Sequence, residues 1–490
     1  MSWRNSREQS RAPFFCLVAG GTAIVFLTLY YLFSPTSTTF GTVQAAASSQ
    51  VSRLSTGTSE LVVDADATTS STTCSVNRTL VETYGEHNIR RSRVHEGTGW
   101  RVQRFLAKLE KGERLKVGVI GGSVSNGHGT LNGHRYQYHA IEHIWHSFVS
   151  SWLNETYCPM ELLNGAKSAT DASFMSFCWT ELLALEKEAP SLVLIELDVN
   201  DQNDEVSRNY TESIVRKILA LPNQPAVIFV GSFALTSQSG TGGMTNGGDA
   251  HAALSAFYDL PQISLRGPLL PALLRNASLA MPFFNDDPRH IAAPLHRFLG
   301  DMVVAYLEEQ RCASLSRDEA GQSVFSSELW PGLETLGELP PRLLTDDWDS
   351  TVVHPVAAPF CRIAGLSLSP VRQDPSWNVW SWKSTKTYLR TGLANQTVEF
   401  DVSVPEGGEG VVGVGFMRSN SPAYKLGFLH CQVGEQETTL DGWWDRDASL
   451  VETQIVTRDL PAGLHRLVCT TGVGRRSDWT AFRLASVVAA

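Results

Sequence analysis

The stretch 115–129, LKVGVIGGSVSNGHG, constrains the fold more than any other part of the chain, because an apolar run ends there on two glycines and a serine. Its valines and isoleucine predict a short buried strand, and Gly121 and Gly122 give the backbone the freedom that a sharp turn needs. Ser123 then lies at the carboxyl end of a strand, which is the edge of an open α/β sheet where ligands bind. A serine in this place is either a nucleophile or the N-cap of a following helix.

Residues 81–317 alternate helical patterns with short apolar strands, which predicts a three-layer α/β domain with a mainly parallel sheet. The loop Thr236–Asp249 is rich in Gly, Ser, Thr and Asn, and we expect it to form a rim of the site. After the strand that precedes Ser123, the expected strands are Glu161–Asn164, Ser191–Leu197 and Ala226–Val230, and the expected helices are Tyr138–Leu153, Ser173–Leu185, Glu212–Leu221 and His296–Glu309.

The C-terminal part changes character. Residues 318–362 are rich in Pro, Gly and acidic residues and predict a linker, and 363–490 predict an all-β sandwich. The strand-like runs in the sandwich are Thr397–Val404, Gly410–Phe416, Leu426–Val433 and Leu464–Cys469. Exposed tryptophans would stack on sugar rings, whereas core packing explains most tryptophans of a sandwich, so carbohydrate binding by this domain is an open alternative. The tryptophans concerned are Trp377, Trp380, Trp382, Trp443, Trp444 and Trp479.

The N-terminus carries an uncharged apolar stretch, 13–33, and a bilayer-spanning helix takes about 20 residues. Three arginines precede this stretch, which predicts a cytosolic tail at 1–12, a single transmembrane helix, and the rest of the chain outside the cytosol. A cleaved signal peptide with a processing site at 45–47 is the alternative, but the length of the stretch favours an anchor. Residues 34–80, rich in Ser, Thr and Ala, predict a flexible stem.

Cysteines and glycosylation motifs agree with a single-pass type II membrane protein of the secretory pathway, in the Golgi or at the cell surface. Seven cysteines follow the apolar span, and an oxidising compartment would pair most of them. Proximity in the sequence suggests Cys158 with Cys178 and Cys431 with Cys469. Asn-x-Ser/Thr motifs occur at Asn77, Asn154, Asn209, Asn276 and Asn395.

Charge excludes one class of partner. The formal net charge is −10, and the basic residues form only short clusters such as Arg475-Arg476. Because nucleic-acid surfaces need an extended basic patch, nucleic acid is not an expected partner.

Three further segments support the hypothesis that Ser123 is a nucleophile. Residues 164–169 follow one predicted strand, 198–201 follow the next, and 287–290 precede the last helix. A doubly wound sheet brings such loops to the edge that carries the serine.

In this order and spacing, the four segments resemble the SGNH (GDSL-type) hydrolase superfamily, whose blocks contribute a serine, a glycine, an asparagine and a histidine. The resemblance covers roughly residues 115–306. Ser123 resembles the nucleophile, although Gly121 and Gly122 stand where the family usually has glycine and aspartate. The other matches are Asn200, which follows Asp198 where the family has glycine; Asp287 and His290, which have the family's Asp-x-x-His spacing; and Ala169, which occupies the glycine position of the second block.

The expected roles follow from elementary chemistry. Ser123 needs an adjacent base, which His290 can supply, and Asp287 would orient the imidazole; His296 is a nearby second histidine that could compete. The N–H groups of Ser123 and Ala169 and the side-chain amide of Asn200 would bind the oxyanion. We expect Ala169 to remain a donor only if its backbone avoids positive φ.

The leading hypothesis is a serine-dependent acyl-ester hydrolase or O-acyltransferase that forms an acyl-Ser123 intermediate and needs no cofactor or metal. Membrane-anchored luminal members of similar families act on glycan O-acyl groups, which makes an acylated glycan the expected substrate class. One alternative is a catalytically inactive glycan-binding membrane glycoprotein. Another is a zinc-dependent protease, because His139 and His143 have the spacing of an inverted zinc-protease motif, although packed or surface histidines also explain them.

Overall fold

The computed structural model describes residues 74–130, 141–157, 159–185, 188–236, 243–284, 287–319, 339–345, 356–382 and 386–490, all within one compact unit, Thr72–Ala490. The predicted tail 1–12, the predicted anchor 13–33 and the stem before residue 74 lie outside these residues. Among the helices that are described, none combines the length and the apolar character that crossing a membrane requires.

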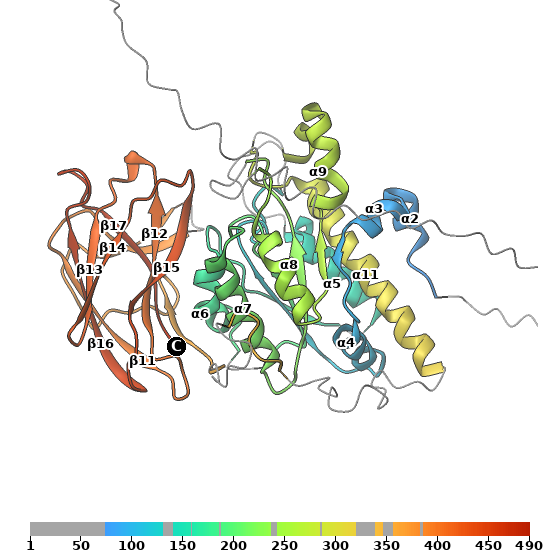
Figure 1. The fold of residues 1–490 in the computed structure, drawn as a ribbon, viewed down its shortest axis with the longest axis horizontal. Coiled ribbons are helices and arrows are strands. Elements are labelled where there is room, and N and C mark those ends of the chain that lie inside the picture. The colour runs from blue at the N-terminus through green and yellow to red at the C-terminus, as the bar shows by residue number, and fades with distance from the viewer. Residues whose placement is uncertain are drawn as a thin grey trace, which may run out of the picture. The chain divides into compact units, whose positions relative to one another are not determined.

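The first domain is built on a six-stranded sheet (Figure 1). All neighbouring strands are parallel except β1, which pairs antiparallel with β6. Across the sheet the order is β1 (Arg93–His95), β6 (Gln262–Ser264), β5 (Ala226–Gly231), β4 (Leu192–Glu196), β2 (Lys116–Gly121) and β3 (Glu161–Asn164). Because the parallel strands point the same way, their following loops meet at one edge.

Helices cover both faces of this sheet, as predicted. In β4, Leu192 and Leu194 face one apolar cluster, while Val193 and Ile195 face another. Strands buried on both sides are therefore apolar throughout rather than alternating. The first face packs on α4 (Trp100–Glu110), α5 (Trp145–Thr156) and α11 (Ala293–Glu319), and the second on α6 (Ala172–Leu182), α7 (Glu205–Leu219) and α8 (Gly247–Phe257) (Figure 1). The shorter helices are α2 (Arg78–Tyr84), α3 (Glu86–Arg91), α9 (Arg266–Arg275) and α10 (Met281–Phe284), with 3₁₀ turns η1 (Ile141–His143) and η2 (Ala277–Ala280).

Two helices begin more than one turn away from the predicted residue. The helix expected from Tyr138 begins only at Trp145, because Ile144 is extended and separates it from the turn η1. The helix expected from Glu212 begins earlier, at Glu205, because the Asp204 side chain caps it. The apolar pattern did not reveal this start of the helix, because the Asp204 cap defines it.

The second domain is a sandwich of two antiparallel sheets, as the sequence predicts. In β11 the side chains of Val398, Phe400 and Val402 point into the core between the sheets, and the residues between them are more exposed. One sheet contains β15 (Ser449–Thr457), β12 (Val412–Ser419), β17 (Phe482–Ala489), β10 (Lys386–Thr391) and β9 (Asn378–Trp382), with β7 (Phe360–Ile363) on β17. The other contains β14 (Gln436–Asp441), β13 (Phe428–Val433), β16 (Gly463–Gly472), β11 (Thr397–Val404) and β8 (Arg372–Gln373), and a 3₁₀ turn η3 (Pro422–Tyr424) precedes β13.

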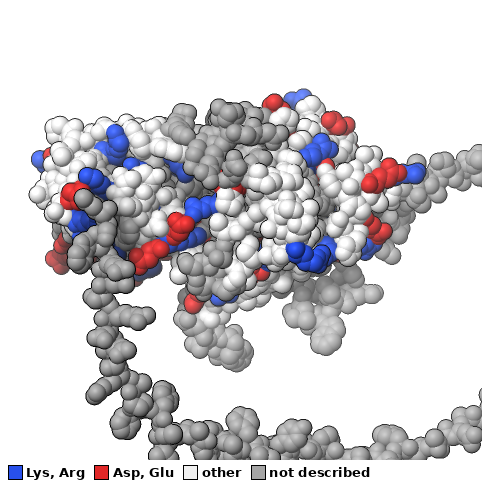
Figure 2. Space-filling view, turned by 90° about the horizontal axis from the view of Figure 1, so that it is seen from above, with Lys and Arg blue, Asp and Glu red and all other residues white. Residues whose placement is uncertain are grey.

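Most of the sandwich tryptophans are at least partly buried. Trp377 and Trp479 are buried in the domain, whereas Trp380, Trp382, Trp443 and Trp444 are half-exposed. On the face drawn in Figure 2, acidic and basic side chains lie interspersed among uncharged ones.

Among the described residues, three disulfides join segments that lie apart in the sequence. The predicted Cys431–Cys469 bond is confirmed, since these residues lie directly opposite each other on β13 and β16. The predicted partner of Cys178 is wrong: Cys178, on α6, bonds to Cys361 on β7, because the fold packs that helix against that strand. Cys158 lies outside the described residues.

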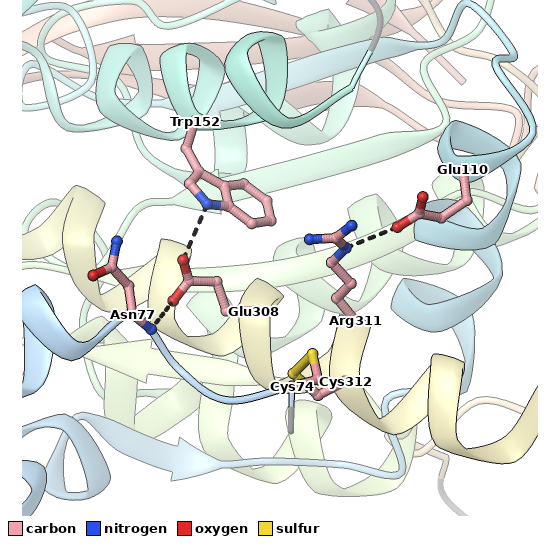
Figure 3. The surroundings of a disulfide bond; sticks show 7 residues. All are labelled: Cys74, Asn77, Glu110, Trp152, Glu308, Arg311 and Cys312. Atoms are coloured by element: carbon pink, nitrogen blue, oxygen red, sulfur yellow. Dashed lines mark hydrogen bonds and ion pairs between the residues drawn. A yellow bond between two sulfur atoms is a disulfide. The ribbon is translucent and has the colours of Figure 1, made fainter. Parts of the chain in front are cut away.

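The third disulfide, Cys74–Cys312, fastens the segment before α2 to the C-terminal half of α11 (Figure 3). Beside it, the Glu308 carboxylate accepts hydrogen bonds from the Asn77 backbone at 2.8 Å and the Trp152 indole at 3.2 Å. The N-terminal segment is thus tied to the helical layer by a covalent bond and by polar contacts.

Candidate active site

Ser123 lies in the tight turn that follows β2. The residue before it has no room for a side chain, because a Cβ on Gly122 would lie 2.6 Å from the Asn200 amide nitrogen. The turn therefore brings the serine backbone against the loop that follows β4. The Ser123 side chain is almost buried and lines a cavity.

The structure brings three predicted residues into one hydrogen-bonded chain. Ser123 Oγ lies 2.7 Å from Nε2 of His290, and Nδ1 of His290 lies 2.8 Å from Oδ2 of Asp287. Asp287 and His290 come from the loop before α11, and Asp287 Oδ1 accepts the Arg289 backbone N–H at 3.0 Å. The arrangement fits a neutral imidazole that donates to Asp287 and accepts the serine proton, a tautomer assigned from these partners.

Electrostatics favour the same protonation states. Burial lowers the pKa of His290 to about 4, and the charge on His128 adds to this effect, while the hydrogen bond to Asp287 opposes it. Burial alone would raise the pKa of Asp287, but hydrogen bonds from His128 and His290 outweigh it and hold this pKa below its ordinary range. At neutral pH the imidazole is therefore neutral and the carboxylate ionised.

The three expected oxyanion donors line the same cavity. Within the described part of the chain, the backbone N–H groups of Ser123 and Ala169 donate to no acceptor. Asn200 uses one hydrogen of its side-chain amide to bond the Thr170 carbonyl at 2.7 Å, which leaves the other available.

The backbone of Ala169 does not meet the condition that the sequence analysis set for it as a donor. Ala169 adopts the left-handed conformation, with φ of 65°, so it takes the geometry that a glycine accepts easily. This conformation costs a non-glycine residue about 1–2 kcal/mol. The Val451 backbone N–H offsets the strain by donating to the Ala169 carbonyl at 2.6 Å.

Asp198 stands where the resembled family has glycine, and a neighbouring histidine binds its buried carboxylate. The His251 imidazole bonds Asp198 Oδ1 at 3.0 Å with Nδ1 and Asp201 Oδ2 at 2.8 Å with Nε2. Burial opposes a charge on His251, but these two carboxylates outweigh it and raise its pKa to about 10. The imidazolium therefore connects the two ends of the loop that presents Asn200. The sequence analysis did not single out His251.

A second histidine that the sequence analysis missed is His128, five residues after the nucleophile. Its Nε2 lies 3.3 Å from Asp287 Oδ2, and its ring stacks on the His290 ring with centroids 3.7 Å apart. His296 does not compete with His290, because it is fully buried and contacts the His128 carbonyl at 3.4 Å. The only signal for His128 was its presence in the motif after Ser123.

The sandwich contributes to the same cavity, which has a volume of about 630 Å³. The Arg446 guanidinium donates to the Asn200 carbonyl at 2.8 Å, and Arg289 pairs with Asp447 at 3.0 Å. The loop before β15 thus contacts the loop that presents Asn200 and the loop that carries Asp287 and His290, here called the triad loop.

Metal binding has weak support. Among the described residues, one group of three side chains could hold an ion: His128, Asp287 and His290. The contacts between these side chains already explain why they lie together. His143 is exposed in η1, before α5 begins, and His139 lies outside the described residues. The helix face that the zinc-protease alternative requires is not among the described elements.

Comparison with known proteins places the fold. No known family matches the sequence, and no curated protein matches it. A two-domain esterase (CEX) active on acetylated mannans, co-crystallised with mannopentaose, matches with a TM-score of 0.59 at 17% identity over 82% of this chain and 97% of that one. A second structure of a two-domain esterase (CEX) active on acetylated mannans matches with a TM-score of 0.57 at 15% identity, over 82% and 98%.

The fold is similar to that of the two-domain esterase, with an α/β domain followed by a β domain. The acetyl xylan esterase AlAXEase also matches, with a TM-score of 0.30 at 17% identity over 39% of this chain and 98% of that one. The match covers most of both chains, so the α/β domain and the sandwich also occur together in that esterase.

Proposed function

We propose that the protein is a serine esterase that removes acyl groups from glycans through an acyl-Ser123 intermediate. The observation that carries this proposal is the chain of contacts from Ser123 through His290 to Asp287, at 2.7 and 2.8 Å, inside a cavity that also holds unused N–H donors. The two-domain esterase of similar fold is active on acetylated mannans, which favours an acetyl group on a sugar as the substrate.

The reaction would proceed in two halves. His290 Nε2 takes the hydroxyl proton while Ser123 Oγ attacks the ester carbonyl carbon, and the negative charge develops on the carbonyl oxygen. The backbone N–H groups of Ser123 and Ala169 and the Asn200 amide would stabilise that oxygen. Collapse breaks the bond to the sugar oxygen, which receives the proton from His290. Water then attacks the acyl-serine by the same route and releases the carboxylic acid.

The decisive experiment uses Ser123→Ala with p-nitrophenyl acetate and acetylated mannan as substrates. We expect loss of about 10³-fold or more in kcat for both, since the nucleophile is removed. Ser403→Ala, an exposed serine on β11, is the matched control and should retain full activity. Unchanged turnover by folded Ser123→Ala would reject the serine mechanism.

Hydrolysis and acyl transfer share the first half-reaction, so a separate measurement distinguishes them. Released acetate and acetylated acceptor are quantified with and without added deacetylated glycan. We expect free acetate to account for the turnover in both cases. Acetate release that falls while an acetylated acceptor accumulates would identify an O-acyltransferase instead.

The inactive glycan-binding alternative depended on the altered second block. Because Ala169 adopts the backbone conformation of a glycine, the substitution gives little reason to expect an inactive site. Labelling of Ser123 by a fluorophosphonate would separate the two hypotheses, since an inactive site would not react.

We also propose that the catalytic part lies in the lumen of the secretory pathway or outside the cell, behind the anchor at 13–33. Three disulfides favour an oxidising compartment. Asparagines at 77, 154, 276 and 395 are exposed, whereas Asn209 accepts a hydrogen bond from Arg342 at 2.6 Å. Fractionation and glycosidase treatment of the expressed full chain test this location.

A further inference from the structure

Two cations of the sandwich, Lys386 and Arg446, line the cavity that holds Ser123. Lys386 begins β10 and is half-buried. Its ammonium lies 5.5 Å from the centre of the Trp382 ring, and within the described part of the chain no carboxylate pairs with it. The cavity therefore presents an uncompensated positive charge beside an aromatic ring.

The carboxylates of the cavity are already engaged. Asp287 takes the hydrogen bond of His290 and contacts His128 at 3.3 Å. Asp447 pairs with Arg289 at 3.0 Å. Neither acid is therefore available to neutralise the lysine.

Burial without a partner is unfavourable for an ammonium group. It lowers the pKa of Lys386 to about 8, which leaves the group mostly protonated at neutral pH. The charge on Lys386 also acts on the candidate active site. It lowers the pKa of His290, although its effect is smaller than that of burial and of the interactions with Asp287 and His128. A carboxylate supplied by a ligand would remove this cost.

Arg446 adds a second donor to the lining of the cavity. Its guanidinium uses one N–H for the Asn200 carbonyl at 2.8 Å and lies 5.5 Å from the centre of the Trp444 ring. It forms no ion pair among the residues that the structure describes, and a guanidinium has five N–H donors.

We propose that the cavity selects acylated glycans whose sugar ring carries a carboxylate, a uronic acid, with Lys386 pairing with the carboxylate and Trp382 contacting the ring. This inference rests on the proposed esterase function. A neutral sugar offers only hydroxyl groups and would leave the lysine charge uncompensated.

The test compares acetylated methyl glucuronide with acetylated methyl glucoside, which differ only in a carboxylate and a hydroxymethyl group. We expect kcat/KM to favour the glucuronide by about tenfold or more, a typical gain for one well-placed polar contact. Lys386→Met should lower the ratio of the two values toward one, and Lys386→Arg should keep it above one. Lys425→Met, an exposed lysine paired with Asp478, is the control that should leave the ratio unchanged.

Equal kcat/KM for the two sugars, or an unchanged ratio in Lys386→Met, would overturn the inference while Ser123-dependent esterase activity remained. Loss of all Ser123-dependent hydrolysis would instead reject the proposed function. Binding gives an independent measurement: Ser123→Ala should bind methyl glucuronide more tightly than methyl glucoside in a calorimetric titration. Equal affinities would contradict the inference even if neither acetylated sugar is turned over.

Discussion

The neutral state of His290 sets the pH range in which the triad can work. Its pKa is about 4, lowered chiefly by burial, whereas an ordinary histidine titrates near 6.5. Because the neutral imidazole is the proposed base, kcat/KM for p-nitrophenyl acetate should fall as pH decreases through about 4 and stay level above about 5. Circular dichroism at each pH separates this titration from unfolding. An acid limb with its midpoint near 6.5 would contradict the prediction.

His128 is the residue whose removal should disturb the triad without removing a reacting group. It stacks on His290 and contacts Asp287, so His128→Gln should loosen both partners. We expect kcat to fall by about tenfold or more with little change in KM, since small displacements of reacting groups are costly. The acid limb should also move to higher pH, because a charge that lowers the pKa of His290 is gone.

His143→Gln is the control for that experiment. This histidine is exposed in η1, so its replacement should leave kcat and KM unchanged. A large loss of activity in His143→Gln that zinc restores would instead revive the metalloprotease alternative.

At the scale of elements, the loop after β3 stores strain at Ala169. Replacement by glycine removes the cost of the left-handed conformation but adds backbone entropy to the unfolded chain. Ala169→Gly should therefore retain kcat/KM and change the free energy of unfolding by about +1 kcal/mol at most. Ala169→Val should lower it by more than about 1 kcal/mol, because a β-branched residue fits positive φ poorly. Urea denaturation of both variants measures the difference.

The Cys74–Cys312 disulfide should contribute stability but not activity. Replacing both cysteines by serine should lower the free energy of unfolding by about 2–4 kcal/mol, since the bond restricts a long loop of the unfolded chain. The first residue of α11 is close to the triad loop. From the rise per residue of a helix, Cys312 lies about 28 Å farther along α11. We therefore expect kcat at 25 °C to be unchanged, and a matching loss of kcat would contradict this separation.

Sequence patterns predicted the elements that bury apolar faces and carry the four blocks. They located β3 and β11 to the residue, because local spacing encodes these features, and they selected Ser123, Asp287 and His290, which the structure places in hydrogen-bonded contact. They missed α4 and α8, and they placed the start of α5 too early, because an extended residue, not the apolar pattern, defines that start. They missed the Cys178–Cys361 bond, His128 and His251, because only the tertiary fold brings these side chains to their partners.

At the scale of the whole molecule, the sandwich supports the proposed active site. Strand β15 lies at the edge of its sheet, and the Val451 backbone reaches out to Ala169 while the Thr453 backbone donates to the Ser173 hydroxyl at 3.0 Å. The sandwich thereby holds the second block in its strained conformation. An isolated α/β domain would lack this support, so the two domains should depend on each other for activity.

Val451→Pro tests that dependence with a single change. Proline removes the N–H that bonds Ala169, and an edge strand tolerates it because this N–H points away from the sheet. We expect kcat/KM for p-nitrophenyl acetate to fall by about tenfold or more, the scale of losing one oxyanion donor. Val451→Ala shortens the side chain but keeps the N–H, so it should retain activity within about threefold. If both variants stay folded in thermal scans and lose activity equally, side-chain packing rather than the backbone bond supports the site.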